Sequence, residues 1–330
     1  MPTIMEKSVH YQQNDPGIRW IKDDNVAINS DGPLDSERTL TPNVVRMGDG
    51  YRMYYHGLGP DRPNPDSKGY ILSAFSTDAE HWEKEPGVRM DAGGEGARHF
   101  IWSPDIIPLA DGRYRMYYEG KTEHEGGEVK AAIVSSISDD GLVWEREPGL
   151  RLAADSASYL APRCLHLDPD AAPAFRLYAS SYPYPDAPAP PGDFNDKNIV
   201  SAVSGDGLSF ELEPGIRVPQ TRDIESSAVY APEVLRLGEG GLRMYYAGWT
   251  PAPEVPAGSK NHGRIFSAFS QDGLEWVKDP GICIDNGGRW DGAKASEPCV
   301  IDLPDGRFRM FYEACDLEGR WRIASATSAI

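Results

Sequence analysis

Residues 100–118 read FIWSPDIIPLADGRYRMYY, and this stretch decides the fold because its pattern recurs along the chain. A proline stands inside an apolar run at Pro104, an Asp-Gly turn follows, and an aromatic-rich segment with an arginine comes next. The other copies are centred on the prolines Pro42, Pro162, Pro232 and Pro298. Self-similarity at a period of about 58 to 70 residues indicates a repeat architecture, so the chain consists of five related units.

Each unit holds four short β-rich segments. The third segment alternates and is rich in Ser and Ala, as in residues 71–75, and the fourth follows an Asp turn and carries an aromatic residue such as Trp144 before Pro-Gly. Turn residues separate the segments, and no stretch has the 3.6-residue period of a helix. This pattern is typical of propeller blades. We therefore predict an all-β, five-bladed β-propeller with four-stranded blades, as a single domain over residues 1–330.

The fifth unit lacks a fourth segment after residues 324–327, whereas a Pro-Gly-Ile-Arg element stands near the other terminus at residues 16–19. We expect the N-terminal strand, within residues 8–19, to pair with residues 321–326 and so close the last blade. Such pairing removes exposed sheet edges.

Loop lengths differ between the two ends of each unit. The connections between second and third segments are long, as at residues 56–69 and 179–197, and so are the connections between units, as at residues 91–100. In a four-stranded blade these two sets of loops fall at the same end. Because binding residues concentrate on long loops of a rigid scaffold, we expect the site at this mouth of the central channel.

The chain has 330 residues and a formal net charge of −18, which argues against a nucleic acid or an anionic membrane as partner. No apolar run approaches the roughly 20 residues of a membrane span, and residues 1–13 do not resemble a signal peptide. Four cysteines without CxxC or Cys/His spacing suggest reduced thiols. We expect a cytoplasmic protein with a small-molecule or oligosaccharide substrate and no cofactor. We assign no metal site, and the alternative is a metal at the channel axis with His56 or His262 as ligand.

Residues that recur in the units are expected to serve the scaffold rather than a ligand. The second-segment arginines Arg52, Arg115, Arg176, Arg243 and Arg309 form one such set, and the aromatics Trp82, Trp144, Phe210 and Trp276 form another. The acids that stand seven residues before four of the prolines are typical of turn caps, and they are Asp35, Asp155, Glu225 and Asp291.

The residues beside each proline differ between units and are therefore free to serve a ligand. After the proline the chain carries Asn43, Asp105, Arg163, Glu233 and Cys299, and before it Thr41, Ser103, Ala161, Ala231 and Glu297. The two positions share one parity of a strand and should point to the same side. Asp105, Glu233 and Glu297 are the candidate catalytic carboxylates. Asn43 and Arg163 are candidate substrate-binding residues, and the alternative is a channel lining in which Arg163 neutralises its neighbours.

A second variable ring lies at the ends of the second segments and comprises His56, Glu119, Ser180, Ala247 and Glu313. Of these, His56, Glu119 and Glu313 are candidate substrate-binding residues. Aromatic side chains expected near the same mouth are Trp102, Tyr159, Tyr230, Trp249 and Trp290. We assign substrate binding by stacking to Trp102, Tyr230 and Trp249, with ordinary packing as the alternative.

Residues 100–118 resemble the second-blade signature of family 43 glycoside hydrolases, and the repeats resemble the five-bladed propeller glycosidases of the arabinanase, levansucrase and invertase type. Residues 138–144, SDDGLVW, are similar to turns found across that superfamily. The resemblance implies a propeller fold and carboxylate acid/base chemistry at the channel mouth.

Family 43 members use an Asp before the first-blade proline as base and an Asp in blade three to tune pKa. Here Thr41 and Ala161 stand at those places, so that catalytic triad does not carry over. Family 130, which includes phosphorylases, is similar in repeat style. In that case Arg163, with Arg98 or Lys294, would bind phosphate.

The leading hypothesis is a glycoside hydrolase-like enzyme. Glycosidic cleavage needs one protonated acid and one ionised carboxylate as base or nucleophile. Glu233 is the predicted acid, because related glycosidases draw their acid from blade four, and Asp105 or Glu297 is the predicted base. The alternatives are a glycoside phosphorylase, a lyase or cyclase that reuses the scaffold, and a non-catalytic sugar-binding propeller.

Overall fold

The computed structural model describes residues 11–12, 14–123, 129–154, 157–167, 172–183, 197–238, 240–255 and 260–329. The regular structure in these ranges is almost entirely β, and a single 3-10 helix, η2 (Asp223–Glu225), interrupts it. No helix in the described ranges is long and apolar enough to cross a membrane. The all-β prediction is confirmed.

Each sequence unit forms four antiparallel strands, which we number from the inside outward. The first unit comprises β3 (Arg38–Met47), β4 (Gly50–Leu58), β5 (Tyr70–Ser76) and β6 (Glu83–Lys84). The second comprises β7 (Phe100–Pro108), β8 (Tyr114–Glu123), β9 (Val129–Ser138) and β10 (Glu145–Arg146). The third comprises β11 (Ala157–His166), β12 (Phe175–Pro183), β13 (Asn198–Ser204) and β14 (Glu211–Leu212).

The last two units join in one nine-stranded sheet through a single parallel pair, Gly263 with Lys294. The fourth unit comprises β15 (Ala228–Leu237), β16 (Leu242–Pro251), β17 (Asn261–Ser270) and β18 (Val277–Lys278). The fifth comprises β19 (Lys294–Asp302), β20 (Phe308–Cys315), β21 (Trp321–Ser328) and β2 (Trp20–Ile28). The short strand β1 (Tyr11–Gln12) pairs in parallel with β15.

An N-terminal strand completes the fifth unit, as predicted, but it is not the predicted segment. β2 pairs with β21, and Trp20 lies opposite Ser328, so the strand follows residues 16–19 instead of containing them. Pro16-Gly17 is therefore not the counterpart of the Pro-Gly that follows a fourth strand. In the structure, Gly17 lies in the turn before the fourth strand, where its carbonyl accepts the Tyr245 hydroxyl at 2.6 Å as Gly141 accepts that of Tyr54.

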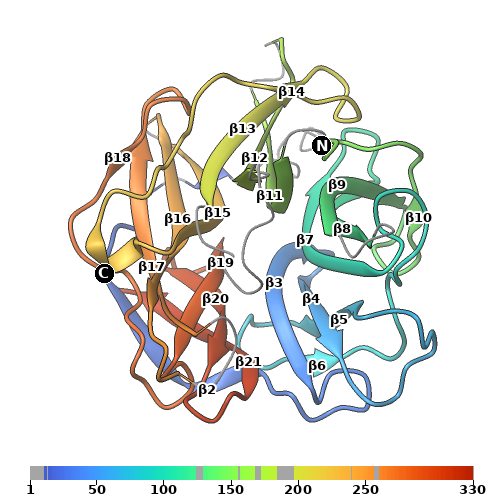
Figure 1. The fold of residues 1–330 in the computed structure, drawn as a ribbon, viewed down its shortest axis with the longest axis horizontal. Coiled ribbons are helices and arrows are strands. Elements are labelled where there is room, and N and C mark those ends of the chain that lie inside the picture. The colour runs from blue at the N-terminus through green and yellow to red at the C-terminus, as the bar shows by residue number, and fades with distance from the viewer. Residues whose placement is uncertain are drawn as a thin grey trace.

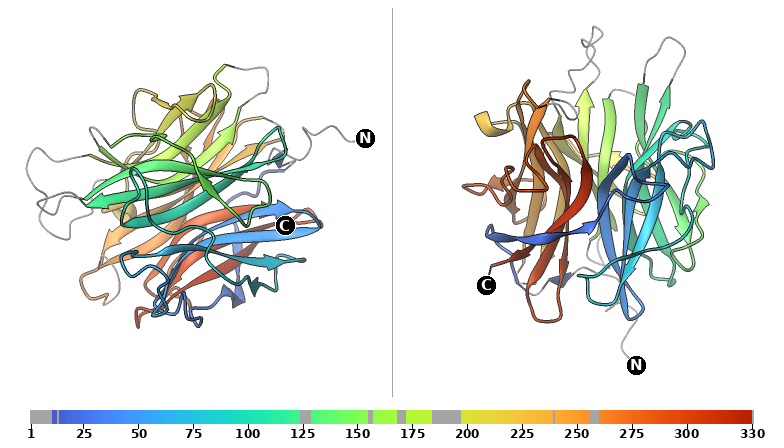
Figure 2. Two further views of the ribbon diagram at one scale, coloured as in Figure 1. Left: turned by 90° about the vertical axis from the view of Figure 1, so that its right-hand side faces the viewer. Right: turned by 90° about the horizontal axis from the view of Figure 1, so that it is seen from below.

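The sheets are arranged around a common centre, with β3, β7, β11, β15 and β19 innermost (Figure 1). Five buried apolar clusters lie between successive units, and one of them links the fifth unit to the first. From the side, the strands run approximately along the viewing axis of Figure 1 (Figure 2). Arg38 at the start of β3 pairs with Leu58 at the end of β4, so inner strands begin where second strands end. We call this face the mouth.

The recurring arginines and aromatics hold neighbouring units together. In the second unit, Arg115 forms an ion pair with Glu147 at 2.8 Å and also donates to the carbonyl of Asp206 in the third. The aromatics of the fourth strands pack edge-on against the second strand of the preceding unit, with centroid distances of 5.4 to 5.8 Å. Trp20 fills this position in the fifth unit, against Tyr245. These contacts confirm the scaffold role predicted for both sets.

Candidate active site

Every inner strand is interrupted at its proline. The residues before the prolines have left-handed backbone angles, with φ between 47° and 55°, and they are Thr41, Ser103, Ala161, Ala231 and Glu297. Strand register shifts at the same points. Such φ values are unfavourable for non-glycine residues and persist only where the surrounding structure imposes them. The predicted regular alternation across the proline is therefore wrong, and the residues before and after it form two separate levels.

The level after the proline forms hydrogen bonds between neighbouring inner strands. Asn43 Oδ1 accepts the N–H of Ile106 at 3.1 Å, and Asp105 Oδ2 accepts that of Cys164 at 2.7 Å. Continuing around the centre, Glu233 Oε1 accepts the N–H of Val300 at 2.9 Å, and Cys299 Sγ accepts that of Val44 at 3.2 Å. These side chains therefore satisfy backbone donors in the next unit, which buried N–H groups require. We call this level the floor ring.

Arg163 is the member of the floor ring whose side chain carries only hydrogen-bond donors. Its guanidinium extends across the centre of the five inner strands. Nη2 donates to the carbonyls of Pro42 and Pro298 at 3.4 and 3.5 Å. Nη1 donates to the Pro162 carbonyl at 2.9 Å and Nε to Glu233 Oε2 at 2.8 Å. Nη1 also donates to the Pro104 carbonyl at 3.5 Å, so the side chain predicted to bind substrate bonds to the four other inner strands and closes the centre.

The floor ring surrounds a cavity of about 30 Å³, which holds about one water molecule and no sugar ring. Burial raises the pKa of Glu233 to about 7 and that of Asp105 to about 6, and Arg163 opposes both shifts. Burial alone would lower the pKa of Arg163, but the two carboxylates raise it above its usual value. A guanidinium keeps its proton in proteins. The geometry therefore favours an architectural role for Asn43, Asp105, Arg163 and Glu233, and their assignment to catalysis or substrate binding stays a prediction.

The level before the proline, nearer the mouth, contains Glu297. The Tyr230 hydroxyl donates to Glu297 Oε1 at 2.6 Å, and the Ser103 hydroxyl donates to Oε2 at 3.2 Å. Glu297, Tyr230 and Ser103 come from the fifth, fourth and second units. The backbone break at the prolines therefore places a carboxylate of one unit among hydroxyl groups of two others.

Two further carboxylates lie beside Glu297. Glu119 Oε1 forms an ion pair with Lys121 at 2.7 Å, and its Oε2 accepts the N–H of Ala161 at 3.3 Å. Glu313 Oε1 accepts the Ser296 hydroxyl at 3.2 Å. Glu119, Glu297 and Glu313 are each buried. We call these three side chains, with Ser103 and Tyr230, the mouth cluster.

Mutual repulsion and burial perturb the mouth cluster. Burial raises the pKa of Glu297, and the charges of Glu313 and Glu119 raise it further, although the Tyr230 hydrogen bond lowers it. Burial also raises the pKa of Glu313, against the effect of the Lys294 ammonium. Burial lowers the pKa of Lys197 to about 7. Shifts of this kind are frequent at catalytic sites, because acid/base chemistry needs groups that titrate near neutral pH.

Aromatic faces surround the cluster, and lysines lie against them. Lys121 Nζ lies 4.0 Å from the centroid of Trp102, and Lys197 Nζ lies 4.6 Å from that of Trp249 and 4.5 Å from that of Tyr230. Lys294 Nζ is 4.4 Å from the Trp249 centroid. At least one face of each predicted stacking residue is therefore in a cation–π contact.

His56 holds Trp102 in place. Its Nε2 accepts the Trp102 indole N–H at 2.8 Å, and its Nδ1 lies 3.0 Å from the carbonyl of Ile101, so the proton is on Nδ1. Burial lowers the pKa of His56 to about 3, which keeps the ring neutral. A side chain at Gly69 would collide with it, since an added Cβ would stand 1.8 Å from His56 Cε1. His56 is fully buried, so the geometry favours positioning of Trp102 over contact with a substrate.

Sequence reasoning missed Lys121 and Lys197, and it named Lys294 only as a phosphate ligand. Each lysine stands beside a long mouth loop or at the start of an inner strand, where the sequences of the units differ from one another. That difference between units was the signal that could have identified them. Two other predicted mouth aromatics lie elsewhere. Tyr159 packs in the apolar cluster between the second and third units, and the Trp290 indole N–H donates to the carbonyl of Asp24 in β2 at 2.9 Å.

Comparison with solved structures gives matches over nearly the whole chain. The RGII complex of BT0996 superposes with a TM-score of 0.72 at 18% identity, over 94% of this protein and 93% of that one. A thermostable family-43 glycoside hydrolase gives 0.63 at 16% identity, over 92% and 89%. The protein has the fold of the propeller-like glycoside hydrolases. At these identities the likeness concerns the fold. It agrees with the resemblance to the propeller glycosidase superfamily drawn from residues 100–118.

The sequence relatives match shorter stretches of the chain. Two uncharacterized proteins of Mycobacterium tuberculosis are 29% identical over 145 residues, which is 43% of this chain and 45% of each of theirs. An extracellular endo-α-(1→5)-L-arabinanase of Thermotoga petrophila is 29% identical over 114 residues, 30% of this chain and 21% of its own length. The chain thus spans less than half the length of these relatives. No family model matches it.

Proposed function

We propose that this protein is an enzyme that cleaves a glycosidic bond of a small carbohydrate or oligosaccharide at the mouth, by carboxylate acid/base chemistry. The observation that carries the proposal is the mouth cluster, where three buried carboxylates from two units lie close together. The pKa values of Glu297 and Glu313 are raised. A glycosidase needs one carboxyl group protonated and another ionised at the same pH. The shared fold with glycoside hydrolases supports the same reaction class.

Glu297 is the proposed general acid. Burial and two neighbouring carboxylates favour its protonated form, because both disfavour another negative charge. Glu119 is the proposed base or nucleophile, because its Oε1 forms an ion pair with Lys121 at 2.7 Å. Glu313 acts on Glu297 by repulsion. The proposed chemistry does not use Asp105 or Glu233, since both their carboxylates bond to backbone N–H groups of the floor ring.

The test compares two substrate types in Glu297→Gln and Glu119→Gln. Loss of a general acid should lower turnover by ~10²-fold or more on glycosides with poor leaving groups and far less on activated aryl glycosides. Loss of the base or nucleophile should lower both. Glu318→Gln, at an exposed residue of the same unit, is the matched control and should change neither. Equal loss on both substrate types in Glu297→Gln would remove it from the acid role.

The proposal also includes the architecture. We propose that the units are the blades of one closed five-bladed propeller over residues 1–330. The apolar cluster between the fifth and first units supports closure, as does the hydrogen bond from Arg309 Nη1 to the carbonyl of Ala79 at 2.8 Å. Limited proteolysis should then release no stable fragment of one to four units. Recovery of a folded fragment would contradict a single domain.

Phosphorolysis is the second candidate, and the three lysines near the mouth favour it. Lys121, Lys197 and Lys294 supply ammonium groups where phosphate would attack, and a structure from the family of mannoside phosphorylases that contains glycoside hydrolases superposes with a TM-score of 0.66 at 13% identity. A phosphorylase would turn over only with inorganic phosphate. A hydrolase would turn over without it.

A further inference from the structure

Among the residues that the structure describes, three units contain the same buried carboxylate site, in which an acid before the inner strand meets a tyrosine of the second strand and a lysine of the fourth. In the first, Asp35 accepts the Tyr55 hydroxyl at 3.0 Å and the Gly32 N–H at 2.8 Å, and pairs with Lys84 at 2.7 Å. In the fifth, Asp291 accepts the Tyr312 hydroxyl at 2.9 Å and the Gly288 N–H at 2.9 Å, and pairs with Lys22 at 2.6 Å. In the fourth, Glu225 accepts Tyr246 at 3.2 Å and pairs with Lys278.

These acids are the predicted turn caps, and their role as internal anions between a tyrosine and a lysine explains their burial. Each is at most 1% exposed. The fourth acid of that predicted set, Asp155, lies outside the described residues. A buried carboxylate is tolerated here because it is paired and hydrogen-bonded.

The second unit keeps the donors of this site and lacks the acid. Tyr118 stands where Tyr55 stands, Arg146 where Lys84 stands, and Ala97 where Asp35 stands. Two contacts fix the equivalence of Ala97. In the first contact, the residue two positions after Ala97 or Asp35 donates its N–H to a carbonyl of the second strand. His99 donates to the Lys121 carbonyl, and Glu37 donates to the Leu58 carbonyl.

The second contact concerns the glycine of the second strand that faces this position. A Cβ added at Gly57 would stand 3.2 Å from Asp35 Cβ, and one added at Gly120 would stand 2.7 Å from Ala97 Cβ. The backbone of the turn also matches, since Gly93 N–H donates to the Ala97 carbonyl as Gly287 N–H donates to that of Asp291. Gly94 is therefore the counterpart of Gly288, the backbone donor to Asp291.

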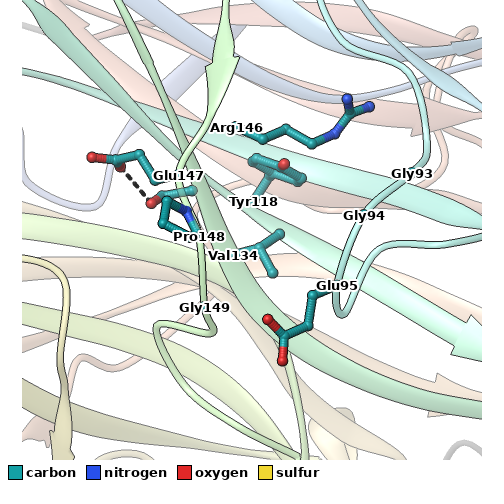
Figure 3. A pocket seen from close by; sticks show the side chains of 10 residues that line it. Gly93, Gly94, Glu95, Tyr118, Val134, Arg146, Glu147, Pro148 and Gly149 are labelled. Atoms are coloured by element: carbon teal, nitrogen blue, oxygen red, sulfur yellow. Dashed lines mark hydrogen bonds between the residues drawn. The ribbon is translucent and has the colours of Figure 1, made fainter.

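A cavity of about 290 Å³ occupies this place in the second unit, lined by Gly93, Gly94, Glu95, Tyr118, Val134 and Arg146 among others. Arg146 and Tyr118 lie along one edge of it, with Gly93 and Gly94 beside the guanidinium (Figure 3). One N–H of Arg146 donates to the Asp91 carbonyl at 2.7 Å, which fixes the guanidinium at the rim. Cavities near 300 Å³ are at the lower end of the range for small-ligand sites.

The carboxylates beside the cavity do not replace the missing one. Glu147 is held by Arg115 in two hydrogen bonds of 2.8 and 2.9 Å. The Glu95 side chain is exposed, and its carboxylate points away from the Arg146 guanidinium (Figure 3). Tyr118 OH lies 3.3 Å from Ser136 Oγ, and a serine hydroxyl can donate there and leave the tyrosine proton for an anion.

We propose that this side pocket binds the carboxylate of a small organic acid, in the position that Asp35, Glu225 and Asp291 occupy in the other units. Arg146 pairs with the carboxylate, Tyr118 donates its hydroxyl proton, and Gly94 offers its N–H. The size of the cavity suits a ligand up to about that of a monosaccharide. The site is separate from the mouth cluster and does not depend on the proposed glycosidase activity.

The experiment is a ligand-observed NMR titration of the full chain with glucuronate, and with glucose as the matched neutral sugar. Glucuronate should bind with a dissociation constant on the order of 1 mM, as expected for a ligand of this size, and glucose should not bind at this site. Arg146→Gln should weaken glucuronate binding about tenfold or more, because it removes a charge-assisted hydrogen bond. Glu297→Gln, at the mouth, should leave this binding unchanged.

Ala97→Asp supplies the missing acid and should abolish glucuronate binding while it raises the melting temperature. If that variant does not fold, Arg146→Gln decides, since Arg146 is exposed. Binding that persists in Arg146→Gln and is lost in Glu297→Gln would place the ligand at the mouth and overturn the proposal. A tenfold gain in Glu95→Gln would identify Glu95 itself as the native occupant and would also overturn it.

Discussion

Asn43→Ala tests whether the floor ring is architectural. The substitution leaves the Ile106 N–H without its acceptor and removes a donor to Asp105, and both bonds are 3.1 Å long and buried. An orphaned buried donor costs about 1–3 kcal/mol, and loss of the second bond adds about 1 kcal/mol, so the free energy of unfolding should fall by about 2–4 kcal/mol. For a chain of 330 residues that is a drop in melting temperature of roughly 3–6 °C.

The assay is thermal and urea unfolding at pH 7, beside turnover if a substrate is known. Ser103→Ala, one residue before the next proline, is the matched control. Ser103 belongs to the mouth cluster. Its substitution should lower the free energy of unfolding by less than about 1 kcal/mol, since Glu297 keeps its hydrogen bond from the Tyr230 hydroxyl. If Asn43→Ala melts like the wild type and instead weakens substrate binding, the floor-ring argument fails and the sequence-based assignment of Asn43 to substrate binding holds.

Three further predictions concern packing, pH and thiols. Trp20→Ala should destabilise the fold by about 2–4 kcal/mol, because Trp20 packs on Tyr245 between the last two units, whereas Ile21→Ala, at a side chain 65% exposed, should cost less than about 0.5 kcal/mol. The pKa values of Asp105 and Glu233 are raised to about 6 and about 7 from ordinary values of 3.8 and 4.5. The folded state therefore binds more protons in this window, and the free energy of unfolding should fall as pH rises from about 4 to about 7. A stability curve that rises across this window in urea titrations would contradict the shifts. Burial raises the pKa of the thiols of Cys164, Cys283, Cys299 and Cys315, so a thiol reagent should label them in urea and hardly at all in the native protein.

The repeat was sufficient to predict the strands and the scaffold side chains. Arg115 and Trp144 recur at fixed offsets from the prolines, and a position that is the same in every unit meets the same neighbours in every unit. The position of the closing strand was harder to predict from the sequence. Pro16-Gly17 matches two different turns of the repeat, and only the pairing of Trp20 with Ser328 and the bond from Tyr245 to Gly17 distinguish them.

The candidate site consists of two levels, one on each side of the inner-strand prolines, and the spacing of residues in the sequence does not reveal this separation. Asp105 and Glu297 stand on opposite sides of their prolines, and a regular strand would send both side chains to one face at similar depth. The left-handed residue before each proline changes the register and leaves backbone N–H groups that the floor ring must accept. Lys197 escaped notice because its contacts, Tyr230 and Trp249, belong to another unit.

The pairing of β2 with β21 bears on the order of assembly during synthesis. Asp23 and the Ser325 hydroxyl that bonds to it are 302 residues apart, so β2 leaves the ribosome long before its partner strand exists. Until then its unpaired edge is open to association with other chains. Closing so long a loop is entropically costly and comes late in folding. A circular permutant that begins after Ile28 and joins Ser328 to Trp20 through a short linker would make this contact local, and we expect it to refold faster and aggregate less than the natural order of strands.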